Sequence, residues 1–438
     1  MGDDMLNSLW AGTAELPVFP QLKGDLKTDV LIVGGGMAGL LCAYMLKQES
    51  VDHALIEADT ICHGVTRNTT AKITSQHGLI YHQLLQRFDA DTTWLYWQVN
   101  ELALQRYRDL CADIPCDFHN RDAFLYALDD LSALDKELDA LNRAGIHADF
   151  VQKTPLPFAI AGALCFRNQA QFHPLMFAAA IAKDLTIYEH TPMHAYKNGT
   201  VITPHGNIKA SRIIIATHFP IINKHGGYFL KMYQDRSYVL ALENAQDVDG
   251  MYLDASGCGL SFRNQGNALL IGGGSHRTGK RSSGWQTAEA FAKRYYPSAT
   301  EGWRWAAQDC ITLDGLPYIG RYSRSTPDLF VATGFRKWGM TSSMAAAIIL
   351  CDLVQGRDNP YAPLFDPSRS MLHPQLMVNA MESALHLLKP TAPRCPHLGC
   401  ALHWNRQERS WDCPCHGSRF SEDGKLLDSP ATGNLKRK

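Results

Sequence analysis

The chain has 438 residues, 42 of them basic and 43 acidic, which gives a formal net charge of −1. This length predicts two or three domains with an ample core. The balanced charge shows no electrostatic footprint for binding to nucleic acids or anionic membranes. The first six residues have neither a basic region nor a long apolar run, so we expect no signal peptide. The apolar run Ala345–Val354 is too short to span a bilayer.

The first predicted elements form a phosphate-binding turn. After an irregular, Pro-containing lead-in over residues 1–24, the β-branched run Thr28–Val33 predicts a strand, and residues 40–46 predict a helix. Between them lie three glycines with the G-x-G-x-x-G spacing, Gly34, Gly36 and Gly39. In such a strand–turn–helix unit, backbone N–H groups and the helix dipole face a pyrophosphate.

A second strand distinguishes this turn from a merely glycine-rich loop, which is the alternative interpretation. The run Asp52–Glu57 ends on an acid 23 positions after Gly34. A carboxylate at that position is expected to bind the adenosine ribose hydroxyls. The sequence therefore favours a dinucleotide-binding domain near the N-terminus.

Three later segments indicate which dinucleotide is bound. Gly64–Lys72 resembles the segment under the flavin in D-amino-acid-oxidase-like flavoproteins, the glycine/sarcosine oxidase superfamily. Arg212–Thr217 is similar to the family's return strand, and Thr312–Gly320 with Phe330–Thr341 resembles its closing motif, where a second helix N-terminus points at the isoalloxazine. The landmarks keep the family's order over about residues 25–360, which implies FAD rather than NAD. The implied FAD-binding residues are Gly34, Gly36, Met37, Ala38, Gly39, Glu57, Thr66, Arg67, Thr70, Ala71, Gly315, Gly334, Gly339, Met340 and Thr341.

The region between these landmarks predicts a second, substrate-binding domain. Residues 80–111 and 128–144 have the periodicity of helices with charged, solvated faces. Strand-like segments predict a mostly antiparallel sheet, at 123–127, 200–203, 237–243, 259–263 and 267–272.

The C-terminal part begins with a predicted helix over residues 371–389, which Lys389-Pro390 stops. It continues with Cys395-Pro-His397-Leu-Gly-Cys400 and Cys413-Pro-Cys415-His416-Gly-Ser418. Two thiolates and two imidazoles, arranged as Cys-x-His and Cys-x-x-His, can divide between the two irons of one [2Fe–2S] cluster. Tetrahedral zinc is the alternative, but zinc sites normally group Cys with Cys and His with His.

The pattern resembles a Rieske domain of the subtype found in respiratory and photosynthetic cytochrome complexes. This resemblance implies that the metal ligands are Cys395, His397, Cys413 and His416, and that Cys400 and Cys415 form a disulfide bond beside the cluster. Unlike a typical Rieske domain, the chain has no strands predicted before Cys395. The remaining lobe of about 48 residues is too small for a core of its own, so the cluster and the larger domain must stabilise it.

We therefore expect an α/β (α+β) fold: a Rossmann-like FAD-binding domain with an antiparallel-sheet substrate domain, plus a small all-β C-terminal Rieske domain. The lead-in over 1–24 precedes the oxidoreductase part at 25–365, whose dinucleotide-binding segments lie at about 25–80, 195–220 and 310–360. A linker helix at 366–391 leads to a minimal Rieske domain at 392–438.

Together, these features predict an FAD-dependent dehydrogenase or oxidase. A flavin accepts two electrons as a hydride, whereas a [2Fe–2S] cluster carries one electron at a time to an external acceptor. The resemblance implies that an amine or amino acid is oxidised at a CH–NH bond. Two alternatives are an oxygen-using amine oxidase with a structural cluster and a redox-sensing binding protein. No catalytic residue is assigned, but the cationic candidates near the flavin are Lys72, Arg236, Arg263, Arg336 and Lys337.

The remaining cysteines indicate the compartment. Eight of the 12 cysteines are scattered without ligand spacing and are interpreted as buried free thiols. Such thiols suit a reducing environment. We therefore expect a cytoplasmic enzyme with no nucleic-acid partner and no membrane insertion.

Overall fold

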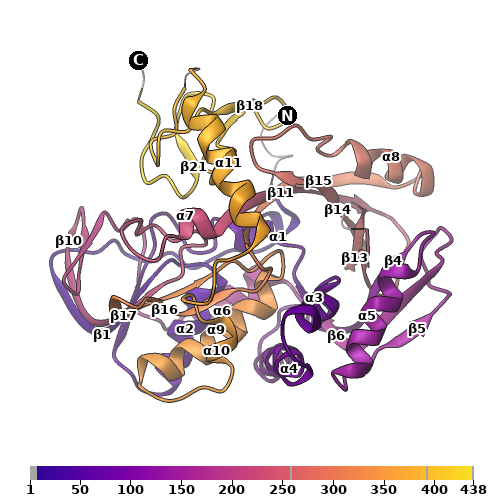
Figure 1. The fold of residues 1–438 in the computed structure, drawn as a ribbon, viewed down its shortest axis with the longest axis horizontal. Coiled ribbons are helices and arrows are strands. Elements are labelled where there is room, and N and C mark those ends of the chain that lie inside the picture. Colours follow the sequence, from indigo (N-terminus) through magenta and orange to yellow (C-terminus); the bar gives the residue numbers. More distant parts are fainter. Residues whose placement is uncertain (1–6, 257–258, 391–392, 437–438) are drawn as a thin grey trace.

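A computed structural model describes residues 7–256, 259–390 and 393–436. It contains two large sheets and a smaller, C-terminal sheet (Figure 1). The first sheet has the order β16-β17-β10-β1-β2-β7, and β9 pairs with β10 and β8. The bounds of these strands are β1 Leu26–Val33, β2 His53–Ile56, β7 Ile187–Tyr188, β8 Ala195–Lys197, β9 Thr200–Thr203, β10 Gly206–Ile215, β16 Tyr318–Ser323 and β17 Thr326–Thr333.

The parallel centre of this sheet forms the dinucleotide-binding unit. Strand β1 pairs in parallel with β2 and β10, so the carboxyl ends of three strands meet at the glycine turn. Helices α2 (Met37–Gln48) and α9 (Gly339–Val354) pack against each other, and both are rich in buried apolar residues because protein surrounds them. The expected strand–turn–helix–strand order is confirmed.

The second sheet is larger and mostly antiparallel, but the segment at 200–203 that was expected in it forms β9 of the first sheet. The order of the second sheet is β15-β11-β14-β13-β12-β4-β6-β3, with β5 beside β6, and the pair β12–β4 is parallel. Strand β11 begins five residues before the predicted position 237. The bounds are β3 Lys72–Ile73, β4 His119–Ala127, β5 Asp149–Val151, β6 Gly162–Gln171, β11 Met232–Glu243, β12 Met251–Asp254, β13 Ser261–Gln265, β14 Ala268–Arg277 and β15 Thr300–Thr312.

The helices around the second sheet differ from the prediction in one respect. The helix expected over 80–111 is broken, because Phe88 is extended and Asp89 caps a new helix by accepting a hydrogen bond from the Thr92 backbone N–H. The lead-in also contains a short helix, which Ser8 caps. The helices not yet given are α1 Leu9–Thr13, α3 Ile80–Arg87, α4 Ala90–Cys111, α5 Ser132–Arg143, α6 Pro174–Ala182, α7 Tyr228–Lys231, α8 Gln286–Tyr295 and α10 Ala362–Phe365.

The C-terminal lobe consists of helix α11 and a four-stranded meander. Helix α11 (Pro374–Leu388) confirms the predicted helix, and each strand of the meander pairs antiparallel with the next. The strands are β18 His403–Asn405, β19 Ser410–Asp412, β20 Arg419–Ser421 and β21 Leu426–Asp428.

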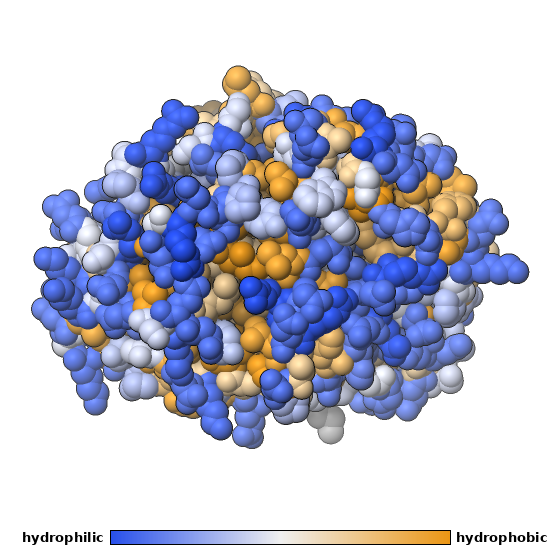
Figure 2. Space-filling view, turned by 90° about the horizontal axis from the view of Figure 1, so that it is seen from below, coloured by the Kyte–Doolittle hydropathy of each residue, from blue (hydrophilic) through white to orange (hydrophobic). Residues whose placement is uncertain are grey.

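Helix α11 has an unusual orientation, because its buried positions are the polar residues Asn379 and His386. Its exposed positions include Met377, Met381 and Leu385. The molecular face seen from below, on the side of α4 and α10, is instead mostly hydrophilic (Figure 2). Within the described residues, no helix is both long and apolar enough to cross a membrane.

Candidate functional site: two adjoining cofactor sites

The glycine turn has the geometry of a phosphate cradle. Gly34 has a φ of +112°, and a Cβ there would lie 2.6 Å from the Ala216 carbonyl oxygen. A Cβ at Gly39 would lie 1.9 Å from the Gly34 carbonyl oxygen, so Gly39 lets helix α2 pack against the turn. Gly36, at the start of α2, has only the Thr66 hydroxyl nearby, at 3.3 Å. The space beside Gly36 and the N-terminus of α2 therefore fit a pyrophosphate.

Glu57, just after β2, binds the turn itself. Its carboxylate accepts hydrogen bonds from the Gly35 N–H at 2.6 Å and the Asp59 N–H at 3.0 Å. Burial raises the pKa of Glu57. The predicted contact with a ribose is compatible with this placement, because Glu57 also lines the adjoining cavity.

The segment predicted to run under the flavin is held by side chains from distant parts of the chain. Trp10 Nε1 donates to the Thr69 carbonyl oxygen at 2.7 Å, which ties helix α1 to this segment. Arg263 is fully buried and donates to the carbonyl oxygens of Thr70 and Ala71. Arg263 therefore supports this segment and does not face the cavity, unlike the expectation that it is a free cation near the flavin.

The closing motif lies opposite this segment. Gly315 and Gly334 have φ values of +79° and +76°, and α9 begins at Gly339. Thr341 accepts a hydrogen bond from the Thr74 N–H at 3.1 Å and donates to its carbonyl oxygen at 3.0 Å. These two bonds fix the N-terminus of α9 next to β3, as the expected flavin motif requires.

A single cavity of about 1100 Å³ joins these segments. That volume exceeds most small-molecule pockets and fits a dinucleotide with space for a substrate. Gly39, Arg67, Ala71 and Thr341 lie outside its lining. The other predicted FAD-binding residues line it, namely Gly34, Gly36, Met37, Ala38, Glu57, Thr66, Thr70, Gly315, Gly334, Gly339 and Met340.

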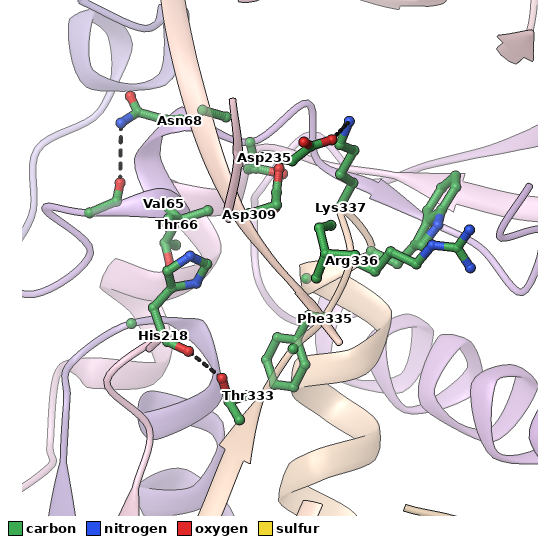
Figure 3. Close-up of a pocket in the computed structure, with 18 of the residues that line it drawn as sticks. Val65, Thr66, Asn68, His218, Asp235, Asp309, Thr333, Phe335, Arg336 and Lys337 are labelled. Carbon is green, nitrogen blue, oxygen red and sulfur yellow. Dashed lines mark hydrogen bonds and ion pairs between the residues drawn. The ribbon is translucent and has the colours of Figure 1, made fainter. Parts of the chain in front are cut away.

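The remaining cationic candidates have different surroundings. Lys72 lines the cavity, and burial, together with nearby Arg263, lowers its pKa to about 7. Arg336 and Lys337 also line it, both with positive φ, a conformation that non-glycine residues rarely adopt. Figure 3 shows the Lys337 side chain next to Asp235 and Asp309, with the Arg336 guanidinium pointing away from them. Arg236 does not line the cavity.

The four predicted cluster ligands lie on two similar loops of the C-terminal lobe. In one loop the Cys395 N–H donates to the Cys400 carbonyl oxygen, and in the other the Cys413 N–H donates to that of Ser418, each at 2.9 Å. Gly399 and Gly417 turn the loops with φ values of +83° and +89°. The two loops therefore present Cys395 and Cys413 in equivalent ways.

The side chains on these loops fit a [2Fe–2S] cluster. The rings of His397 and His416 lie 5.0 Å apart between centroids, and the Nδ1 atom of each is buried without a hydrogen-bond partner. Burial lowers the pKa of His397 to about 3 and that of His416 to about 4, so both rings are neutral, the form that binds iron. Cys395 and Cys413 are buried beside them.

Cys400 and Cys415 lie next to the site that fits the cluster. The sulfur atoms of Cys400, Cys413 and Cys415 are all within 4.8 Å of one another. No disulfide bond joins Cys400 to Cys415 in the structure, where both are free thiols. The predicted disulfide therefore stays a prediction.

Strands β11 and β15 separate the cavity from the cluster loops. Their alternate residues Tyr233, Asp235, Ser237, Ala307, Asp309 and Ile311 line the cavity. The residues between them face the lobe: Gln234 Nε2 donates to the His416 carbonyl oxygen at 2.7 Å, and Gln308 Nε2 donates to that of Gly417 at 2.9 Å. Because side chains alternate between the faces of a strand, one sheet layer contacts both sites.

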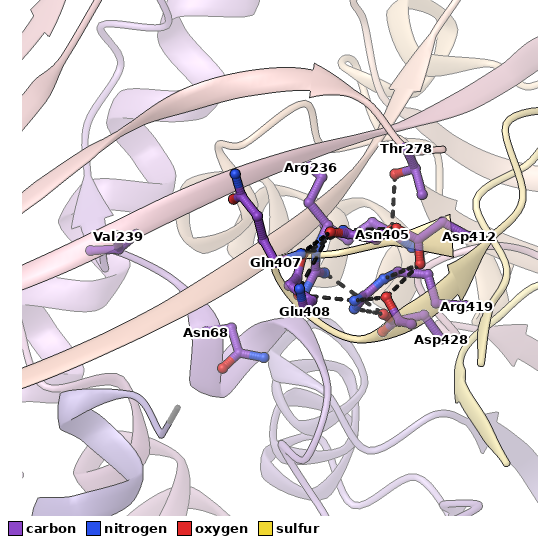
Figure 4. A network of polar contacts seen from close by, with 12 residues as sticks. Asn68, Arg236, Val239, Thr278, Asn405, Gln407, Glu408, Asp412, Arg419 and Asp428 are labelled. Carbon is purple, nitrogen blue, oxygen red and sulfur yellow. Dashed lines mark hydrogen bonds and ion pairs between the residues drawn. The ribbon is translucent and has the colours of Figure 1, made fainter. Parts of the chain in front are cut away.

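Ion pairs hold the lobe against this layer (Figure 4). Across the interface, Arg236 Nε of β11 donates to Glu408 Oε1 at 2.8 Å. Within the lobe, Arg419 donates to Glu408, Asp412 and Asp428 and so holds Glu408 in place. The Arg236 and Glu408 side chains are 7% and 10% exposed. Arg236, a cationic candidate for the flavin site, is thus a structural residue of the interface between the two parts.

The lobe also completes the cavity. Residues Lys425–Ser429 of the lobe belong to its lining, as does His218 from the loop after β10. Burial lowers the pKa of His218 to about 4. The ring of its neighbour Phe219 lies 6.4 Å from that of His397. The sequence analysis did not identify Asp235, Asp309 and His218 as residues of the cavity, because no local motif marks them.

Comparisons with known proteins agree with this architecture. The family model for FAD dependent oxidoreductases (DAO) matches residues 29–353, and the Rieske [2Fe-2S] domain model matches residues 373–437. The protein is therefore a member of the DAO family of FAD-dependent oxidoreductases, and it carries a C-terminal Rieske [2Fe–2S] domain.

Individual relatives extend these matches. The chain is 34% identical to a putative Rieske 2Fe-2S iron-sulfur protein of Bacillus subtilis, over 98% of this chain and 96% of the relative. A cytochrome b6-f complex iron-sulfur subunit of Nostoc punctiforme is 51% identical over 9% of this chain and 23% of its own length. The fold is similar to that of glycine oxidase from Geobacillus kaustophilus, with a TM-score of 0.67, 21% identity and coverage of 79% and 100% of the two chains. L-proline dehydrogenase from P. horikoshii has a TM-score of 0.66 at 17% identity, with 80% and 98% coverage.

Proposed function

We propose that the protein oxidises a CH–NH bond of an amine or amino acid and passes the electrons from FAD through the Rieske cluster to an external acceptor. When bound, FAD supplies a hydride acceptor and the cluster supplies a one-electron carrier. The observation that carries the proposal is the arrangement of β11 and β15, which contact the cavity with one face and the cluster loops with the other.

Each group of residues has a role in this proposal. The glycine turn and α2 hold the pyrophosphate, and the segment at Gly64–Lys72 with the start of α9 encloses the flavin. Gln234 and Gln308 hold the second cluster loop against the sheet. The proposed cluster ligands are Cys395, His397, Cys413 and His416, supported by the unpartnered Nδ1 atoms.

Two finer statements belong to the same proposal. A disulfide between Cys400 and Cys415 is supported by the proximity of their sulfur atoms, and mass spectrometry of unreduced peptides tests it. A cytoplasmic location is supported by the cysteines of the described residues, which are free and buried. The division into an oxidoreductase part at 25–365 and a Rieske part at 392–438 is likewise a proposal.

An anaerobic titration tests the electron path. An amine and amino-acid panel is added to the holoenzyme while flavin absorbance and the cluster's paramagnetic resonance signal are followed. We expect flavin bleaching followed by the appearance of the reduced-cluster signal. A Gln234→Ala, Gln308→Ala variant should keep the first event and slow the second.

Other outcomes identify the alternatives. Flavin bleaching that is reversed by O₂ while the cluster stays oxidised would indicate an oxidase with a structural cluster. A flavin that no substrate reduces, beside a cluster that titrates with the ambient potential, would indicate a redox-sensing protein. Either result contradicts the proposed dehydrogenase.

A further inference from the structure

Two aspartates face each other in the cavity. Asp235 on β11 and Asp309 on β15 are direct cross-strand neighbours, and both line the cavity. Like charges directly opposite in an antiparallel pair are destabilising, and burial of a carboxylate adds to that cost. Burial and nearby Asp235 raise the pKa of Asp309 to about 6. The pair is therefore unfavourable for folding.

One cation partly compensates for this pair. Lys337 Nζ lies 3.4 Å from Asp235 Oδ2 and also bonds the Ser275 hydroxyl. Arg336 and Lys337 both have left-handed backbone conformations, with φ values of +46° and +70°. Such strain persists where the surrounding structure imposes it, and it is concentrated at functional sites. Two carboxylates thus share one ammonium group, so one negative charge is left for a second cation to neutralise.

The other cations of the region are occupied elsewhere. Arg236 binds Glu408 on the opposite face of β11. The Arg336 guanidinium lies 3.4 Å from Gln83 Oε1 and points away from both aspartates (Figure 3). Lys72 donates to the Tyr252 carbonyl oxygen at 3.4 Å. None of these three cations forms an ion pair with Asp235 or Asp309, so Lys337 compensates one of the two carboxylate charges there.

We propose that Asp235 and Asp309 form the binding site for the ammonium group of the substrate, so that the substrate class is amines without a neighbouring carboxylate. This inference rests on the proposed oxidation at a CH–NH bond and narrows its substrate. A substrate carboxylate next to the same nitrogen would meet two like charges, whereas an ammonium group completes a balanced set of two cations and two anions.

Paired substrates test the selectivity. Each amino acid is compared with the amine that remains when its carboxylate is removed, such as phenylalanine with phenethylamine, in anaerobic flavin reduction by the holoenzyme. We expect the amine of each reactive pair to have a kcat/KM at least tenfold higher. Equal or higher values for the amino acids would overturn the inference while leaving the proposed oxidation intact.

A binding measurement separates this inference from turnover. Tetramethylammonium has no N–H bond or free electron pair, so it cannot be oxidised to an imine, and its binding is followed by the flavin absorbance of the holoenzyme. We expect saturable binding that benzoate does not reproduce. Asp309→Asn should weaken it at least tenfold, whereas Asp247→Asn, an exposed carboxylate outside the cavity, should not change it.

Stability distinguishes a binding role from a structural one. A carboxylate kept for folding would lower the melting temperature when replaced, whereas removing one of two opposed charges should leave it unchanged or raise it. Asp309→Asn should therefore combine weaker tetramethylammonium binding with an unchanged or higher Tm. Unchanged binding in Asp309→Asn, or a lower Tm with normal binding, would overturn the proposal.

Discussion

In the FAD-binding part, the main core joins apolar side chains of α2, α4, α9 and β1, whereas four of the buried hydrophobic residues of the C-terminal lobe are cysteines. These four are Cys395, Cys400, Cys413 and Cys415. The lobe also docks through the buried ion pairs of Arg236 on β11 with Glu408 and Asp428 of the lobe. A large apolar core keeps its shape without a ligand, but a core that includes two proposed metal ligands, Cys395 and Cys413, should depend on the metal. Cofactor loss should therefore affect the two parts differently.

The largest effect is expected from Cys413→Ser. Removal of a proposed ligand should prevent cluster insertion, and the lobe should unfold because the cluster is part of its core. The variant should still bind FAD, since the glycine turn belongs to the other core, but it should exchange FAD faster because the lobe no longer closes the cavity. Iron analysis would show the loss of the cluster, and limited proteolysis would show cleavage after residue 390. Cys165→Ser, a buried thiol of β6, serves as the control and should retain both cofactors. A compact, protease-resistant lobe without iron would contradict the expected difference between the two parts in their dependence on a cofactor.

The converse experiment uses Gly36→Val. A side chain here has space in the protein itself, with only the Thr66 hydroxyl at 3.3 Å, but would fill the phosphate cradle. We expect a folded protein with an intact cluster and little FAD, measured by the flavin and cluster absorbance. Gly39→Val should instead prevent folding, because its Cβ would lie 1.9 Å from a backbone oxygen. Full FAD occupancy in Gly36→Val would place the pyrophosphate elsewhere.

The docking of the lobe is tested by Arg236→Met. Removing one partner of a buried ion pair leaves an uncompensated charge, and we expect a loss of about 3 kcal/mol in stability. Denaturant unfolding would measure it. Arg167→Met is the matched control, because its pairs with Asp122 and Asp149 are half exposed and should be worth about 1 kcal/mol or less. Equal losses in the two variants would show that the interface does not depend on Arg236.

The pH dependence of amine binding gives a smaller effect. Asp309, whose pKa burial raises to about 6, faces Asp235 on β11 and Lys337 before α9, and the Arg236 charge acts on it from the opposite face of β11. Its anionic form is needed to bind an ammonium group, so the KM for the amine should rise roughly tenfold per unit as the pH falls below about 6. In Asp309→Asn that rise should be absent. A KM independent of pH between 5 and 7 in the wild-type enzyme would argue against Asp309.

The smallest effect is expected at Ser418, whose hydroxyl accepts the Ala431 N–H at 3.0 Å inside the lobe. A hydroxyl donor beside the cluster stabilises its reduced form, so Ser418→Ala should lower the reduction potential without changing iron content. A redox titration followed by paramagnetic resonance would measure the change. A potential equal to that of the wild type would place this hydroxyl away from the cluster.

The cofactor motifs could be predicted from sequence because their spacing is local. Gly34, Gly36 and Gly39 lie within six consecutive residues, and each ligand loop also spans six residues. The pairing of Asp235 with Asp309 depends on the register of strands that are distant in sequence, which no local pattern reveals. Arg236 was misplaced for a related reason: β11 begins before residue 237, and alternation along the strand turns Arg236 toward the lobe.

The lobe's contribution to the cavity wall has a consequence for how the enzyme is assembled. Residues 425–429 can close the cavity only when the lobe is folded, and we expect the lobe to fold only with its cluster. Iron supply would then govern how firmly FAD is held: a chain without iron would keep its glycine turn but exchange FAD faster with the solvent. Maturation would have an order, in which insertion of the inorganic cofactor seals in the organic one.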